Sequence, residues 1–151
     1  MMSLLRKTVR KSPANVGVAH GLWGESQAAS FLRRQGYVII ERNSRPCSRD
    51  ERLEVDVVAY DKEAESIVFV EVKQHASRSL RQTRLRSVSR GKMDNLLRAC
   101  RAWLRKNRWQ GAYRFDVVEV YGIPEGGAPE IDHIERVNLF ASREKFVNWS
   151  D

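Results

Sequence analysis

Long hydrophobic runs, a secretory signal and cysteine clusters are all missing from this sequence. No stretch of 18 apolar residues occurs among its 151 residues, so no segment is expected to span a membrane. Residues 1–11 lack the continuous apolar core of a signal sequence. The two cysteines, Cys47 and Cys100, do not have the spacing of metal ligands, and we interpret them as reduced thiols. We therefore expect a cytoplasmic protein without a membrane partner.

Acidic residues are scarce in two stretches of the chain. Residues 1–16 contain four basic residues and no acid, and residues 78–108 contain eleven Lys or Arg against one acid, Asp94. The formal net charge is +8, yet the remainder of the chain has twelve basic and eighteen acidic residues. A basic band on an otherwise acidic domain is typical of a phosphate-binding surface, although a solvated charged face is the alternative. We expect a nucleic acid as partner, contacted by Arg78, Arg81, Arg84, Arg86, Arg90, Lys92, Arg98, Arg101 and Arg105.

Length and composition predict one folded domain that follows an N-terminal tail. An apolar fraction of 42% and four tryptophans are enough for a real core in 151 residues. Residues 1–16 are basic and turn-prone, which indicates a flexible N-terminal tail. Residues 17–151 are expected to form the single domain.

Hydrophobic spacing predicts two helices and five strands, in the order helix, three strands, helix, two strands. This order indicates an α/β domain with a mixed central sheet. The strands at 53–60 and 67–73 should form an antiparallel hairpin, and the second is apolar on both faces, as a central strand is. The helices are expected at residues 21–35 and 92–107, and the strands at 37–41, 53–60, 67–73, 113–121 and 131–137.

Charged residues interrupt the valine-rich hairpin strands at four positions. Glu54 and Asp56 are two residues apart and so share one face of their strand, as do Glu71 and Lys73 on the next. A buried charge needs a partner or a metal ion. If the strands are adjacent, Asp56 and Glu71 can hold a hard divalent cation such as Mg²⁺, with Mn²⁺ as a substitute. The alternative is an exposed pair of acids at the strand ends.

Two further residues have both a catalytic and a structural interpretation. Lys73 can stabilise negative charge on a phosphate or lower the pKa of an attacking water, or it can simply pair with Glu71. Glu25 falls on the same helical stripe as Leu22 and Leu32, where a carboxylate needs a partner. Its alternative role is to compensate the helix dipole near the N-terminus.

Asp56 on one strand, followed by Glu71-Val72-Lys73 on the next, resembles the motif of the PD-(D/E)XK nuclease superfamily, in which an acid is followed by Glu-x-Lys. The ordered motifs over residues 17–140 further resemble the YraN-like family, a bacterial group of uncharacterised proteins similar in fold to Holliday-junction resolvases. Two positions depart from the family pattern: Leu53 replaces a glycine and His75, expected on the surface, replaces an arginine. The matching motifs are Gly21-Leu-Trp-Gly-Glu25, Glu54-Val-Asp56, Phe69-Val-Glu-Val-Lys73, Lys92 and Arg114-Phe-Asp-Val-Val118.

The resemblance implies a restriction-endonuclease-like fold, with three layers and a mixed central sheet flanked by helices. It also implies Mg²⁺-dependent hydrolysis of DNA phosphodiesters at branched or otherwise structured DNA, by a homodimer. The catalytic residues would be Glu25, Asp56, Glu71 and Lys73, with Asp56 and Glu71 as metal ligands. Two alternatives remain open: a catalytically inactive nucleic-acid-binding module on the same fold, and an interaction protein that uses its aromatic C-terminus.

Overall fold

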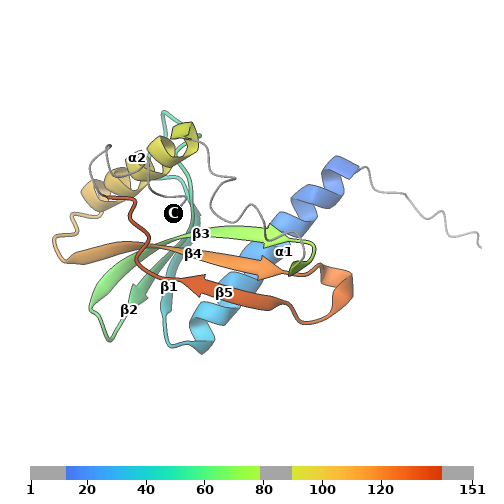
Figure 1. The fold of residues 1–151 in the computed structure, drawn as a ribbon. Helices are drawn as coiled ribbons and strands as arrows, with labels where there is room; N and C mark the ends of the chain where they lie inside the picture. The colour runs from blue at the N-terminus through green and yellow to red at the C-terminus, as the bar shows by residue number, and fades with distance from the viewer. Residues whose placement is uncertain (1–12, 79–89, 141–151) are drawn as a thin grey trace, which may run out of the picture.

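The structure, a computed structural model, describes residues 13–78 and 90–140. Its five strands form one mixed sheet in the order β1-β2-β3-β4-β5, with one helix on each face (Figure 1). The elements are α1 Pro13–Arg34, β1 Val38–Ser44, β2 Val55–Asp61, β3 Ser66–His75, α2 Arg90–Lys106, β4 Ala112–Tyr121, the short 3₁₀ helix η3 Pro124–Gly126 and β5 Glu130–Ile134. The predicted fold class, a three-layer restriction-endonuclease-like α/β fold, is confirmed.

β3 is a central strand, as expected. β1, β2 and β3 are consecutive antiparallel neighbours, so the predicted hairpin is present. β3 and β4 run parallel and are joined through α2, while β5 returns antiparallel to β4. A parallel connection needs a crossover, and this one places α2 across the sheet face opposite α1.

Alternation along β3 divides the core into two layers. Ile67 and Phe69 pack toward α2, where Trp103 stacks edge-on against Phe69 at 5.6 Å between ring centroids. Val68 and Val70 pack toward α1, against residues such as Leu32. Burial of each large apolar side chain contributes about 1.5–3 kcal/mol. Glu71 and Lys73 continue the alternation of Phe69 and therefore extend along the α2 side of the sheet.

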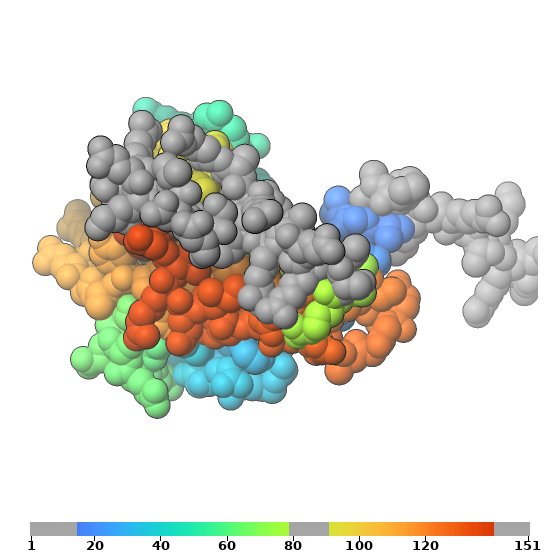
Figure 2. Space-filling model, viewed as in Figure 1, coloured from blue at the N-terminus to red at the C-terminus, as the bar shows by residue number. Residues whose placement is uncertain are grey.

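The first helix differs most from its prediction. α1 begins at Pro13 rather than residue 21, so the last four residues of the expected tail are helical, while residues 1–12 lie outside the described part. The N-terminal turns of α1 project past the sheet (Figure 1, Figure 2), which leaves Val18 and Leu22 66% and 55% exposed. Leu22 is therefore not on the core stripe, and Trp23 packs there instead. Apolar periodicity could not reveal turns that bury no apolar face.

Neither described helix combines the length and the hydropathy that a bilayer crossing requires. Cys47 is half-buried and Cys100 is buried, and both are free thiols, in agreement with the interpretation from sequence. The assignment of residues 17–151 to one domain stays a prediction, because residues 79–89 and 141–151 lie outside the described part.

Candidate metal centre

Strand register aligns three polar residues across β1, β2 and β3. The β2–β3 ladder ends at the pair Val57↔Val70, and Asp56 and Glu71 are the next residues on the two strands, with their carboxyl groups close enough for a hydrogen bond. On the other side of β2, the pairs Arg42↔Val57 and Ser44↔Val55 bracket Asn43 opposite Asp56. Asn43, Asp56 and Glu71 thus form a transverse row, called here the polar row.

Asp56 is held between the backbone of β3 and the Glu71 carboxylate. The amide N–H of Val72 donates to Asp56 Oδ2 at 2.8 Å. Burial, followed by the nearby negative charge of Glu71, raises the pKa of Asp56 to about 8, although the Val72 hydrogen bond opposes the shift. Two carboxylates this close repel one another until a proton or a cation lies with them.

Two lysines from different elements meet at one oxygen of Glu71. Lys73 Nζ lies 3.2 Å and Lys92 Nζ 2.7 Å from Glu71 Oε1. Burial lowers the pKa of Lys73, and Lys92 adds to this shift while Glu71 opposes it. Burial also acts to lower the pKa of Lys92, but Glu71 outweighs it and the pKa is raised. Glu71 is only 4% exposed, so the expected alternative of an exposed acid pair is wrong.

Glu25 approaches the polar row from α1. Because α1 begins twelve residues earlier, at Pro13, Glu25 lies in mid-helix and the alternative role at the helix N-terminus is wrong. The amide of Asn43 is assigned with its nitrogen toward the carboxylates of Glu25 and Glu54, since its oxygen would meet only other acceptors there. In this orientation Nδ2 donates to Glu25 Oε2 at 2.9 Å and to Glu54 Oε1 at 3.2 Å. Burial raises the pKa of Glu25, and the charges of Glu54 and Glu71 add to the shift against the Asn43 hydrogen bond.

An open cleft of about 540 Å³ gives access to this centre. It lies between the β2–β3 carboxylates and the first turns of α2, so both acidic and basic groups face it. The cleft is lined by Arg52, Glu54, Asp56, Glu71, Gly91, Lys92, Asn95 and Leu96.

Apart from Lys92, which lies at the centre, the predicted phosphate-binding residues fall into three groups. Arg98, Arg101 and Arg105 line a second hollow of about 350 Å³ beside α2, near Cys47 and Leu53. Arg98 Nη2 also lies 3.7 Å from Asp50 Oδ2. Residues Arg81, Arg84 and Arg86 lie outside the described part, as does the side chain of Arg90.

Arg78 forms the third group, and it is engaged with acids of the sheet. Its guanidinium pairs with Glu130 and Asp132 of β5 and lies over the ring of Tyr121, 4.5 Å from the centroid. These contacts compete with any phosphate for the guanidinium. A nucleic-acid contact by Arg78 stays a prediction.

The expected surface position of His75 is wrong. Its side chain is 12% exposed and stacks on Tyr121 with ring centroids 5.0 Å apart. His75 Nε2 lies 3.8 Å from Glu119 Oε1, and Tyr121 Oη donates to Glu119 Oε2 at 2.6 Å. The cause is that β3 continues to His75, two residues past its predicted end, and pairs there with β4.

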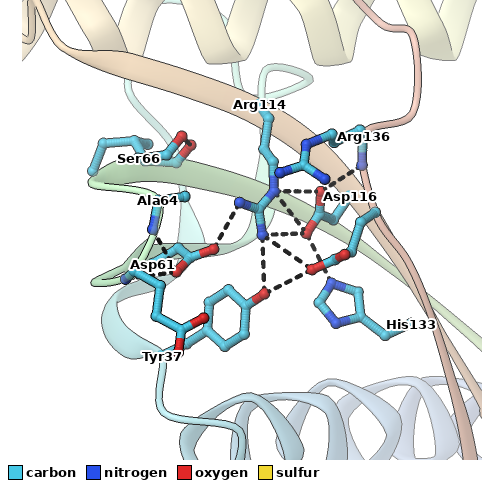
Figure 3. A network of polar contacts seen from close by, with 11 residues as sticks. Tyr37, Asp61, Ala64, Ser66, Arg114, Asp116, His133 and Arg136 are labelled. Atoms are coloured by element: carbon cyan, nitrogen blue, oxygen red, sulfur yellow. Dashed lines mark hydrogen bonds and ion pairs between the residues drawn. The ribbon is translucent and has the colours of Figure 1, made fainter.

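A second cluster has the residue types of a metal site but is built around an arginine. Asp116, His133 and Glu135 offer ligand atoms within 4.8 Å of one another. Figure 3 shows the Arg114 guanidinium in their midst, with Nη2 3.2 Å from Asp116 Oδ2 and 2.9 Å from Tyr37 Oη. His133 Nε2 lies 2.8 Å from the same Asp116 oxygen.

Burial acts to raise the pKa of Asp116, but His133 and Arg114 outweigh it and the pKa is lowered. A cation here would have to displace a guanidinium that already neutralises the acids. In the structure the cluster is an ion-pair network that ties β2, β4, β5 and the α1–β1 connection together.

Sequence reasoning missed three polar residues of the candidate site: Arg52 and Asn95, which line the cleft, and Asn43 of the polar row. Of the three, only Asn43 has a sequence context from which a special role could have been predicted. It is a residue type that tolerates left-handed backbone, placed at a strand end just before a Ser-Arg-Pro turn. Arg52 and Asn95 are brought there by the packing of the 45–53 segment and α2, which no local pattern encodes.

The fold and the pairing of acids on adjacent strands define a restriction-endonuclease-like α/β protein. The chain belongs to the uncharacterised protein family UPF0102, whose sequence model matches residues 24–120. It is 41% identical over 117 residues to the UPF0102 protein of Trichlorobacter lovleyi, covering 77% of this chain and 87% of that protein. The Pelobacter propionicus protein is 40% identical over 121 residues, which cover 80% of this chain and 81% of that protein. The Thermotoga petrophila protein is 38% identical over 119 residues, which cover 78% of this chain and 96% of that protein. The resemblance to the YraN-like family is thereby confirmed.

Proposed function

We propose that this protein is a Mg²⁺-dependent endonuclease that hydrolyses DNA phosphodiesters at branched or otherwise structured DNA. One observation carries the proposal: the carboxyl groups of Asp56 and Glu71, from adjacent strands, lie side by side, with Lys73 and Lys92 at Oε1 of Glu71. Buried acids of this kind are costly for folding, and such a cost is typical of functional sites.

The residues present fit a hard divalent cation. The carboxyl groups of Asp56 and Glu71 lie together, and carboxylate oxygens are the ligands that such a cation prefers. Burial raises the pKa of Asp56 first and the charge of Glu71 second, and the repulsion between the two carboxylates is what a bound cation would relieve. Mg²⁺ prefers one or two carboxylates and keeps several waters, and when bound it would polarise a phosphodiester and lower the pKa of nearby water.

Each nearby side chain has a role that its environment supports. Asp56 and Glu71 would hold the cation, and the desolvated Lys73 would stabilise negative charge as it develops on the phosphate. The lowered pKa of Lys73 also makes its ammonium a better proton donor to water or to the leaving oxygen. Glu25 would orient water from the α1 side.

The arginine stripe on α2 supports a polyanionic substrate. Arg98, Arg101 and Arg105 recur at helical spacing on the helix whose first turn supplies Lys92 to the centre. At 1.5 Å per residue, the stripe from Arg98 to Arg105 is about 10 Å long, on a side of α2 that does not include Lys92, and it can contact neighbouring phosphates of one strand. Such contacts position a substrate without reading its bases.

The test is incubation of metal-free protein with linear, nicked, flapped and four-way DNA in Mg²⁺ or Mn²⁺. Cleavage that requires the metal and is abolished by Asp56→Asn and strongly reduced by Lys73→Ala is the expected result. An RNA of matched sequence serves as the control for the sugar. Wild-type activity in the Asp56→Asn protein would exclude the proposed centre, since it would point to a contaminating nuclease.

A non-catalytic nucleic-acid-binding module is the second candidate, favoured by the lysine contacts themselves. Both ammonium groups lie on Glu71 Oε1, so they already supply positive charge where a cation would bind. If the two ammonium groups stay bound to Glu71 and keep a divalent cation out, the protein will bind DNA in a salt-sensitive way without cleaving it in any divalent metal. A homodimer, with two centres for two strands, is proposed for the enzyme alone, and sedimentation with and without DNA tests it.

A further inference from the structure

We propose that Asn43 is a positioning residue: its amide holds the Glu25 carboxylate beside Asp56 and Glu71, so that Glu25 can orient water around a bound divalent cation. The inference rests on the proposed function and adds a residue of β1 to that site. Mg²⁺ keeps much of its water when bound to proteins, so residues that hold these waters contribute to its affinity without contacting it.

The amide bridges two separate elements. An amide NH₂ has two hydrogens, and the two acceptors within reach of Asn43 Nδ2 are Glu25 Oε2 at 2.9 Å and Glu54 Oε1 at 3.2 Å. Both N–H groups are therefore used, one toward α1 and one toward the segment that enters β2. The other oxygen of Glu25, Oε1, is left to accept a hydrogen bond from water.

Without this bridge, the two carboxylates would repel one another. Glu54 has a separate partner, since Arg45 Nη2 lies 3.2 Å from its Oε2. For Glu25 the bridge is the hydrogen bond found among the described residues. A glutamate side chain gains rotamer entropy when released, so Glu25 would swing toward solvent.

The backbone of Asn43 supports a special role. Its φ is 50°, in the left-handed region, within a strand whose neighbouring residues pair regularly with β2. That conformation is unfavourable for most L-residues, while asparagine and glycine adopt it more readily. Glycine would satisfy the backbone but lose the amide, and aspartate would lose the donors and add a third negative charge. Asparagine meets both requirements.

The decisive variant is therefore Asn43→Gly, which keeps the backbone and removes the bridge. Asn43 is exposed, so the change should not lower the melting temperature. We expect the affinity of the metal-free full-length protein for Mn²⁺, measured by calorimetry, to fall about 10- to 100-fold, the range for residues that orient metal ligands. Glu65→Gly is the matched control: it has the same φ of 50° in the exposed β2–β3 turn and should leave Mn²⁺ affinity unchanged.

A double-mutant cycle separates positioning from a merely structural effect. If Asn43 acts through Glu25, then Asn43→Gly should cause little further loss of affinity in a Glu25→Gln protein. Independent, additive losses would overturn the inference, as would equal Mn²⁺ affinity in wild type and Asn43→Gly.

The same measurements distinguish a failure of the proposed nuclease activity from a failure of the role of Asn43. Wild-type protein that binds Mn²⁺ through Asp56 yet cuts no DNA contradicts the nuclease activity, while the affinity ratios still decide the role of Asn43. Wild-type protein that binds no Mn²⁺ overturns both proposals.

Discussion

The ammonium of Lys92 lies 2.7 Å from Oε1 of Glu71 and joins helix α2 to the central strand. The contact brings the basic helix and the acidic strands together at the mouth of the cleft. Glu71 is almost fully buried, whereas the Lys92 side chain is 46% exposed. Lys92 can therefore leave when another cation or a phosphate arrives, but Glu71 cannot move away.

Removal of this ammonium should strengthen cation binding. Lys92→Met keeps the apolar stem and removes a positive charge that competes at Glu71. We expect a few-fold tighter binding of Mn²⁺ by calorimetry, together with weaker DNA binding. Lys106→Met, at the exposed C-terminal end of the same helix, is the control. Weaker Mn²⁺ binding in Lys92→Met would mean that the lysine supports the site instead of competing for it.

Asp56→Asn should abolish cleavage yet stabilise the metal-free protein. Burial and Glu71 raise the pKa of Asp56 to about 8, so the folded chain binds this proton more tightly than the unfolded chain. Wild-type stability should therefore fall as pH rises from about 4, the ordinary value, to about 8. The variant lacks this loss, and asparagine can still accept the Val72 hydrogen bond.

Thermal unfolding in EDTA from pH 5 to pH 9 measures the difference. At pH 8 the melting temperature of Asp56→Asn should exceed that of wild type by several degrees, since about 1 kcal/mol shifts it by roughly 2–4 °C at this length. A lower melting temperature at every pH would show that the charge of Asp56 stabilises the fold.

Asp116 should behave in the opposite way, because its pKa is lowered. Asp116→Asn removes one of three acidic partners of Arg114, since Asp61 and Glu135 remain, and should cost about 1–3 kcal/mol at pH 7. For a lowered acid pKa, the stabilisation is complete above the unfolded value near 4 and disappears as pH falls through the folded value. The difference between the proteins in urea unfolding should thus shrink below about pH 4. Glu63→Gln, in the exposed turn, should show no such difference.

The α2 arginines should contribute affinity without specificity. Arg101→Ala is expected to weaken DNA binding uniformly across sequences and to reduce the slope of log affinity against log salt by about 1. Fluorescence anisotropy at several salt concentrations measures both quantities. Arg33→Ala, at the C-terminal end of α1, should leave them unchanged. An unchanged salt slope for Arg101→Ala would place the DNA elsewhere.

Much of the fold could be read from periodicity, because alternation and helical spacing are local. The valine-rich runs predicted β2 and β3 as a hairpin, and apolar residues on both faces predicted β3 as central. Periodicity failed to predict element ends whose burial does not follow from the local sequence pattern. The exposed first turns of α1 and the buried end of β3 at His75 were assigned incorrectly for that reason.

By itself the sequence determined the α/β class, the strand pair that bears Asp56 and Glu71, and the family, since these depend on residue order and side-chain period. Only the tertiary structure decided what meets those acids: Lys92 from α2 at Glu71, Asn43 between Glu25 and Glu54, and Arg114 among Asp116 and its neighbours. Contacts between elements far apart in the chain depend on register, crossover and helix packing. No short window of residues encodes these, because each is fixed only when the whole sheet is assembled.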